Sequence, residues 1–244
     1  MPLQSVEPFT ADPAFFTADD RAALSRDGVQ DTPSQLIDMR ILELLSARLC
    51  HELSGPVAAI NNGIELLLDE EPGPGSSMAP SFIRDAVALL GDSAHRVRHR
   101  LQFYRFAYGF GRRGTNTGAA PHELAGGFFA TTRVVCDYAE VVRKMSPEWQ
   151  RLACNLLPIG ADAVPRGGRL ALTDNPFALV AVGETAALSS ETRAALTLIT
   201  PVAELTVRTV QAYFTGLLAR ALGQCLVGTA EPGRVRLTAI PAGS

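Results

Sequence analysis

One stretch decides the fold of the first half of this chain: Ile41-Leu-Glu-Leu-Leu-Ser-Ala-Arg-Leu-Cys-His51-Glu52-Leu-Ser-Gly-Pro56-Val-Ala-Ala-Ile-Asn-Asn-Gly-Ile-Glu65. Its large apolar residues recur every three or four positions. At about 100° per residue they form one stripe along a helix. This stripe consists of Leu49, Leu53, Ile60 and Ile64. His51 lies roughly 180° from the stripe, where a core residue is not expected.

The helix face around His51 carries small or polar residues. They are Ala47, Ser54, Gly55, Ala58, Asn62, Glu65 and Asp69, with Leu44 as the one large apolar exception. A docking partner that must reach an imidazole nitrogen needs such an open face. The pattern therefore predicts a partner-binding surface on which chemistry takes place at the histidine.

Two long helices are predicted, from about residue 34 to 68 and from about 80 to 109, with a Pro/Gly/Ser loop near 71–77 between them. Thr32 or Ser34 is a candidate N-cap of the first helix, with Asp38 in its first turn. Pro56 should bend this helix without ending it. A short connection makes the helices an antiparallel hairpin. Because one hairpin leaves most of its apolar stripe uncovered, we expect two copies to form a homodimeric four-helix bundle.

The composition indicates a globular chain of one or two domains. It has 244 residues, of which 47% are hydrophobic and 19% charged, and the net charge is −3. This charge argues against nucleic-acid binding, and no apolar run is long enough to span a membrane. Residues 1–33 form an arm without secretory features, so a cytoplasmic location is expected. The cysteines fit no metal-site spacing and are predicted to be buried free thiols.

The second half alternates helical and strand patterns. Helices are predicted at 121–131, 148–164, 188–195 and 206–223, and strands at 132–138, 169–173, 177–182, 224–229 and 234–240. This alternation favours an α/β sandwich. The predicted domains are an arm at 1–33, a helical hairpin at 34–112 and a sandwich at 119–244. Overall the fold class is α+β.

His95 and His99 lie four residues apart on the second helix, a spacing that can hold a metal. Their neighbours Arg96, Arg98 and Arg100 would repel a cation. A solvated basic face is therefore the preferred interpretation.

Several motifs resemble those of sensor histidine kinases over residues 34–241. His51-Glu-Leu-x-x-Pro56 resembles the H-box, whose histidine accepts a phosphoryl group on a two-helix hairpin. The run from Asn155 to Gly168 aligns without gaps on the N-box and the Pro-x-Gly-Gly turn. Residues 219–226 and 231–241 resemble the last helix and hairpin of the ATPase domain. The resemblance implies a degenerate Bergerat (ATPase-like) sandwich after the hairpin.

The departures from the kinase pattern concern the nucleotide. Ile159 stands where a metal-binding Asn is expected, and Asp162 where a Lys is expected. The strand at 179–182 is followed by Gly183-Glu-Thr-Ala-Ala in place of the adenine-binding Asp-x-Gly-x-Gly. Mg²⁺ needs oxygen ligands and phosphates need a backbone cradle. We therefore expect that this chain binds no ATP, no other cofactor and no metal.

An H-box hairpin joined to a nucleotide-free ATPase-like domain resembles the ChpT family, dimeric histidine phosphotransferases of alphaproteobacterial cell-cycle phosphorelays. The resemblance implies that His51 takes a phosphoryl group from the receiver Asp of a hybrid kinase and passes it to response regulators. Mg²⁺ would come with the receiver. Glu52 could fix the His51 tautomer or lie in solvent. The predicted receiver-binding residues are Ala47, Ser54, Gly55, Ala58, Asn62 and Glu65.

Two alternatives remain open at this point. The chain could be an ATP-dependent histidine kinase with an unusual nucleotide site, which ATP-dependent labelling of His51 would reveal. It could also be a non-catalytic adaptor that binds receivers, in which case loss of His51 would leave its role intact.

Overall fold

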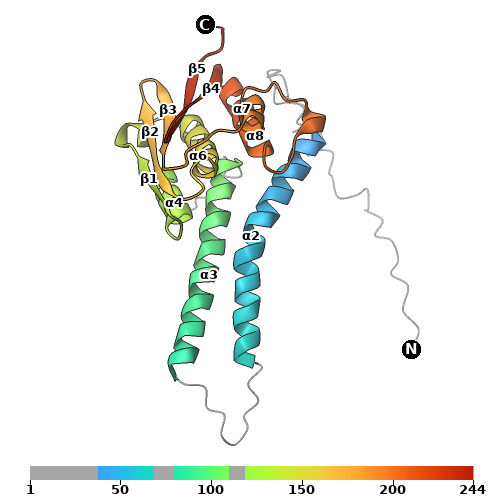
Figure 1. The fold of residues 1–244 in the computed structure, drawn as a ribbon, viewed down its shortest axis with the longest axis vertical. Coiled ribbons are helices and arrows are strands. Elements are labelled where there is room, and N and C mark those ends of the chain that lie inside the picture. The colour runs from blue at the N-terminus through green and yellow to red at the C-terminus, as the bar shows by residue number, and fades with distance from the viewer. Residues whose placement is uncertain (1–37, 69–79, 110–118, 244) are drawn as a thin grey trace, which may run out of the picture. The chain divides into compact units, whose positions relative to one another are not determined.

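The computed structural model describes residues 38–68, 80–109 and 119–243. Two long helices come first and a five-stranded sheet with its own helices follows, so the chain is of the mixed α+β class (Figure 1). The predicted arm at 1–33, the loop at 71–77, Asp69 and most of the linker at 109–118 lie outside the described residues. The predicted domain boundaries therefore stay predictions.

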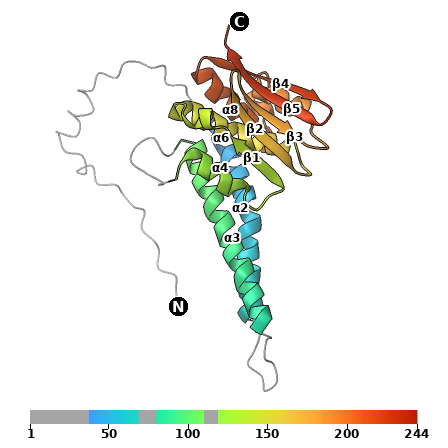
Figure 2. The ribbon, with the colours of Figure 1, turned by 90° about the vertical axis from the view of Figure 1, so that its left-hand side faces the viewer.

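The hairpin consists of α2 (Met39–Leu68) and α3 (Pro80–Ala107), which pack against each other along their length (Figures 1 and 2). Pro56 lies inside α2, and the helix continues past it as predicted. The Asp38 carboxylate accepts the Arg40 N–H at 2.9 Å, so Asp38 caps this helix. Gly63 allows a close approach of the helices, because a Cβ there would lie 2.7 Å from Leu90 Cδ2.

The sheet has the strand order β1-β2-β3-β5-β4. Its strands are β1 (Val134–Tyr138), β2 (Gly168–Asp174), β3 (Phe177–Val182), β4 (Gln224–Glu231) and β5 (Arg234–Pro241). β1 and β2 are parallel, and the other neighbours are antiparallel. Buried residues alternate along β2 and β5, whereas Phe177 through Ala181 of β3 are all buried. β3 is therefore the central strand of the core.

Helices cover one face of this sheet, on the side of the hairpin (Figure 2). They are α4 (Pro121–Phe129), α5 (Glu140–Arg143), α6 (Pro147–Asp162), α7 (Ser190–Leu196) and α8 (Val210–Ala221), with a 3-10 turn η2 at Val202–Glu204. The sequence pattern predicted every one of these except α5 and η2. α8 begins later than predicted, because Thr206 and Thr209 hydrogen-bond each other in a separate turn.

An aromatic cluster joins the hairpin to the sheet region. Phe103 and Tyr104 of α3 are buried, and the Phe103 ring stacks on Phe128 of α4 with centroids 4.2 Å apart. The Tyr104 ring meets Phe128 edge-on at 5.6 Å. These contacts place the last two turns of α3 in the same core as the sheet.

Candidate functional site

His51 lies in the middle of α2, and its side chain is exposed. The six predicted receiver-binding residues surround it on the same helix face. All of them are exposed in this chain: Ala47, Ser54, Gly55, Ala58, Asn62 and Glu65. Ser54 donates its hydroxyl hydrogen to the Cys50 carbonyl at 2.7 Å, so its side chain lies along the helix. The imidazole is thus approachable across a low, mostly uncharged surface.

Glu52 has a different environment from His51, although the two are adjacent. Its side chain is only 17% exposed, and both carboxylate oxygens contact arginines. Arg48 lies 3.3 Å from one oxygen, and Arg100 of α3 bonds the other. Glu52 therefore does not lie in solvent, which was one of its two predicted environments. Its charge is compensated within the hairpin.

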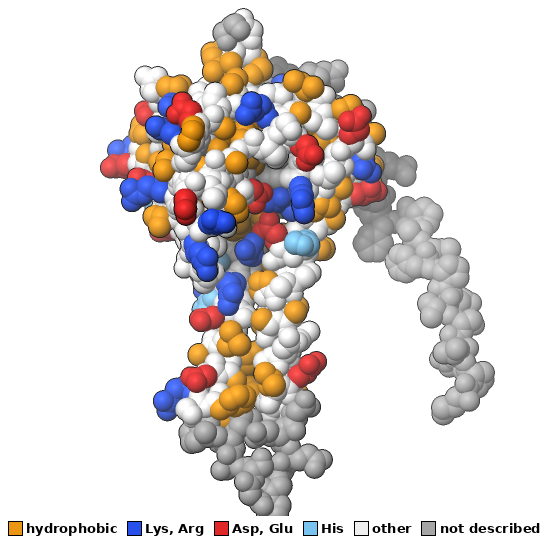
Figure 3. Space-filling view, in the orientation of Figure 1, with side chains coloured by type: hydrophobic (Ala, Val, Ile, Leu, Met, Phe, Trp, Pro, Cys, Tyr) orange, Lys and Arg blue, Asp and Glu red, His pale blue; other side chains and the backbone are white. Residues whose placement is uncertain are grey.

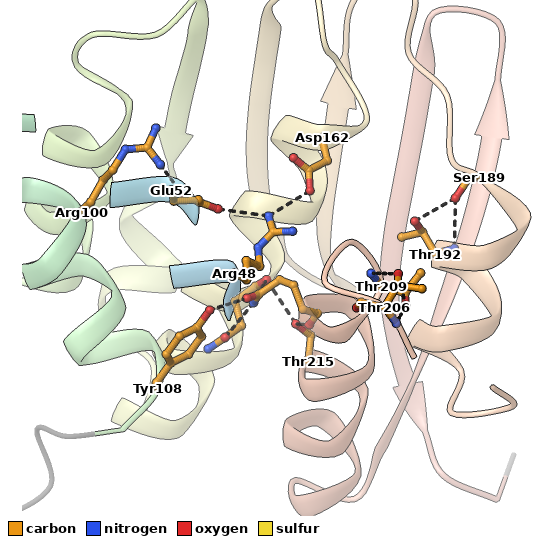
Figure 4. A network of polar contacts seen from close by, with 12 residues as sticks. Arg48, Glu52, Arg100, Tyr108, Asp162, Ser189, Thr192, Thr206, Thr209 and Thr215 are labelled. Carbon is orange, nitrogen blue, oxygen red and sulfur yellow. Dashed lines mark hydrogen bonds and ion pairs between the residues drawn. The ribbon is translucent and has the colours of Figure 1, made fainter. Parts of the chain in front are cut away.

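Arg48 connects the hairpin to the sheet region. Its Nη2 lies 3.1 Å from Oδ2 of Asp162 at the end of α6, so the guanidinium lies between Glu52 and Asp162 (Figure 4). Burial lowers the pKa of Arg48, but the nearby Asp162, Tyr104 and Glu52 outweigh it and the pKa is raised above its ordinary value. Arg48 thus carries its positive charge one helical turn before His51.

The sequence pattern predicted that Arg100 belongs to a solvated basic face, and this prediction is wrong. Its guanidinium bonds Glu52 and lies 5.2 Å from the centre of the Phe128 ring. Burial, followed by the charge of Glu52, raises the pKa of the neighbouring Tyr104 well above its ordinary value. The prediction of a solvated basic face holds better for His95 and Arg98, which are exposed. Their side-chain nitrogens lie 3.1 Å apart.

The ionic contacts of three residues near His51 were not predicted from the sequence: Arg48, Arg100 and Asp162. One signal was available, because Arg48 and Glu52 have the i, i+4 spacing of a helical ion pair. The other two partners lie 48 and 114 residues away along the chain. No local pattern links residues at that separation.

The residues expected to hold a nucleotide in a kinase do not fit one here. Ile159 is 3% exposed and packs in the hydrophobic core. Asp162 brings a carboxylate to the place of a lysine and pairs with Arg48. Asn155, the first residue of the N-box-like run, is fully buried and donates to the Ala107 and Arg151 carbonyls. None of these groups is placed as a ligand for Mg²⁺ or a phosphate.

The cysteines correct a further prediction. Cys154 is buried and Cys136 half-buried, but Cys50 and Cys225 are exposed. Cys50 lies on the accessible side of α2, and Cys225 belongs to the edge strand β4. Within the described ranges, no three His, Cys, Asp or Glu side chains gather into a group that could hold a metal ion.

Comparison with known proteins defines the class of this chain. A family model described as the histidine phosphotransferase C-terminal domain matches residues 119–231. The protein phosphotransferase ChpT of Brucella abortus (strain 2308) is 34% identical over 201 residues, which cover 78% of this chain and 90% of the relative. A solved structure of a bacterial phosphotransferase shares 29% identity, with a TM-score of 0.66 over 85% of this chain and 99% of the other.

These matches identify a histidine phosphotransferase. More narrowly, the chain belongs to the ChpT family of protein phosphotransferases, as the sequence motifs predicted. None of the helices that the structure describes is long and apolar enough to cross a lipid bilayer.

Proposed function

We propose that this chain carries phosphoryl groups between receiver domains on His51. The observation that supports this proposal is the exposed histidine at the centre of a helix face made of small and polar residues, in a member of a histidine phosphotransferase family. The donor is the phosphorylated receiver Asp of a hybrid kinase, and the acceptors are the receiver Asp residues of response regulators. The exchange takes place in the cytoplasm.

The transfer consists of two displacements at phosphorus. A neutral ring nitrogen of His51 attacks the aspartyl phosphate with its lone pair, an N–P bond forms, and the P–O bond to the receiver carboxylate breaks. The carboxylate leaves with the electron pair. In the second step the Asp of another receiver attacks the phosphohistidine, and the N–P bond breaks. Positioning supplies most of the catalysis, and the receiver supplies the Mg²⁺ that compensates phosphoryl charge.

The six exposed residues around His51 form the receiver-binding surface in this proposal. Small residues such as Gly55 and Ala58 let the receiver backbone approach the helix. Asn62 and Glu65 offer polar contacts at the end of the face. Glu52 acts through Arg48 and Arg100, which hold its carboxylate, and its effect on His51 is one of position.

The sheet region is proposed to be a degenerate ATPase-like domain that binds no ATP. Ile159 and Asp162 support this, because one is apolar and buried and the other is paired with Arg48. The chain is also proposed to form a homodimer through the hairpin. Large apolar side chains are exposed along its outer half, including Leu66, Phe82 and Val87, and hydrophobic side chains are visible there in Figure 3. A second hairpin would cover them in a four-helix bundle.

A label-transfer experiment tests the function. A receiver domain labelled on its phosphoryl group is mixed with the protein and Mg²⁺ without ATP. We expect label on the wild type, none on His51→Ala, and unchanged labelling of the matched control His95→Ala, another exposed hairpin histidine. Labelling from ATP by the protein alone would establish the kinase alternative. Receiver binding without any transfer would establish the adaptor alternative.

A further inference from the structure

We propose that four polar side chains fix the sheet region beside His51 and so determine the surface that a receiver meets. These residues, named the junction cluster here, are Arg48, Arg151, Asn155 and Asp162. The proposal rests on the function proposed above, because it takes His51 as the phosphoryl acceptor. It assigns positioning roles to residues that do not touch the reacting atoms.

On the α2 side, the cluster acts next to the reactive helix turn. Arg48 bonds Asp162 of α6 at 3.1 Å and Glu52 at 3.3 Å. His51 follows Arg48 by three residues, which is about 4.5 Å along the axis and about 60° around it. The end of α6 is therefore held beside the His51 face. Arg100 balances the group, so that two arginines face two carboxylates.

On the α3 side, the cluster binds the end of the helix. The last carbonyls of a helix lack partners within it. The Asn155 amide donates to the Ala107 carbonyl at 2.7 Å, and Arg151 donates to the Ala107 and Tyr108 carbonyls, each at 3.0 Å. The final turn of α3 is thus tied to α6 by three hydrogen bonds from two side chains.

Helix α8 completes this junction. Gln211 donates to the Asn155 side-chain oxygen at 3.0 Å and accepts the Tyr108 hydroxyl hydrogen at 2.9 Å. Thr215 donates to the Asn155 carbonyl at 3.3 Å. Asn155, Gln211 and Thr215 are all buried, so their partners cannot be replaced by bulk water without opening the junction.

These contacts are directional, unlike the apolar packing around Phe103. Hydrogen bonds and ion pairs fix an angle as well as a distance. The junction cluster bonds both helices of the hairpin, and the described residues after 37 pack as one compact unit. A receiver docking on His51 therefore meets a surface of fixed shape. If the cluster is loosened, docking should weaken while the imidazole chemistry stays the same.

Transfer kinetics test this split between docking and chemistry. Asp162 is suitable because its side chain is 62% exposed, so its replacement should leave the fold intact. In Asp162→Lys, the receiver concentration for half-maximal transfer should rise about fivefold, the loss expected for one partly exposed ion pair. The maximal rate should not change. Asp162→Glu should restore the wild-type value, and the control Glu140→Lys, which breaks an exposed ion pair at α5, should match wild type.

A distance measurement tests the junction without any transfer. Cys50 and Cys225 are exposed and accept spin labels, while burial protects Cys154 and raises the pKa of the Cys136 thiol to about 12. Labelled chains are diluted into unlabelled protein, so that the distances are within one chain. We expect one narrow Cys50–Cys225 distribution in wild type and in Glu140→Lys. It should be broader in Asp162→Lys and broadest in Asn155→Ala.

The two readouts separate failure of this inference from failure of the proposed function. Narrow distributions in both cluster variants, or an Asp162→Lys effect on the maximal rate alone, would overturn the junction cluster as a positioning device. If wild type transfers nothing while the distributions broaden as expected, the function of His51 is wrong and the rigid junction stands. Thermal melting checks that Asn155→Ala is folded, and Asp162→Lys carries the test if it is not.

Discussion

The sheet region and the outer half of the hairpin bury their apolar residues in different ways. In the sheet region, residues such as Leu156, Leu179 and Leu237 are almost fully buried by their own chain. In the outer hairpin, Leu66, Phe82 and Val87 are about half exposed or more. One part therefore has a complete core in a single copy, whereas the other leaves large apolar side chains exposed, which the dimer proposed above would cover. His51 lies near the border between the two.

The largest expected effect is the disruption of the dimer contact proposed for the hairpin. Replacing both Ile83 and Val87, which are 43% and 54% exposed, with Glu should raise the dimer dissociation constant by roughly two to three orders of magnitude, because an uncompensated charge would be buried between the chains. Sedimentation equilibrium measures this. The matched control is the same change at Val135 and Val227, exposed valines of the sheet. If the changes at Val135 and Val227 dissociated the dimer instead, the sheet region and not the hairpin would be the part that needs a partner.

The next effect sharpens the claim that the sheet region is complete in one chain. Leu179 of β3 lies between Leu172 and Leu237 in the register and is fully buried. Leu179→Ala should lower the free energy of unfolding by about 2–5 kcal/mol, through lost burial and the cavity left behind. Urea denaturation at several protein concentrations measures it. A loss that shrinks strongly as concentration rises would mean that this core also depends on the partner.

A smaller effect concerns a local cap in the sheet region. The Ser189 side chain accepts the Thr192 N–H at 3.1 Å and caps α7. Ser189→Ala should cost about 1 kcal/mol. Thermal melting checks this, with Ser190→Ala, one residue inside the helix, as the control. Equal losses in the two variants would show that the cap has no special role.

The smallest effect comes from an exposed ion pair. Glu140 and Lys144 are 2.8 Å apart and about three-quarters exposed. Glu140→Gln should change the free energy of unfolding by less than about 0.5 kcal/mol, since solvent screens such pairs. Melting in low and high salt measures it. A larger loss of unfolding free energy that disappears in high salt would show that this surface pair stabilises the fold more than its exposure suggests.

Most elements of the fold were predictable from local patterns. The antiparallel strands β2 and β3, for example, follow from two apolar runs separated by Asp174-Asn175-Pro176. Helix α5 was missed because four residues are too few to show a helical period. The exposure of Cys50 was not predictable from composition and compartment, which favour buried thiols. Its helical angle, about 40° from that of the exposed Ser54, was the better guide.

The site was predictable only in part. The helical period placed His51 and its small neighbours on one face, and all of them are exposed. The environment of Glu52 was not predictable, because it depends on Arg100 of the other helix. The role of Asp162 was equally hidden. The sequence motif marked it as a departure from a kinase, but only the folded chain brings it to Arg48.

The strand order of the sheet has a consequence for synthesis on the ribosome. β5 is the last strand along the chain, yet it pairs with β3 on one side and β4 on the other. β3 cannot gain its second neighbour until residues 234–241 have emerged from the exit tunnel. Until then, the edge of β3 that pairs with β5 presents unpaired backbone N–H and C=O groups in the nascent chain. This interval is when we expect the growing chain to depend most on chaperones.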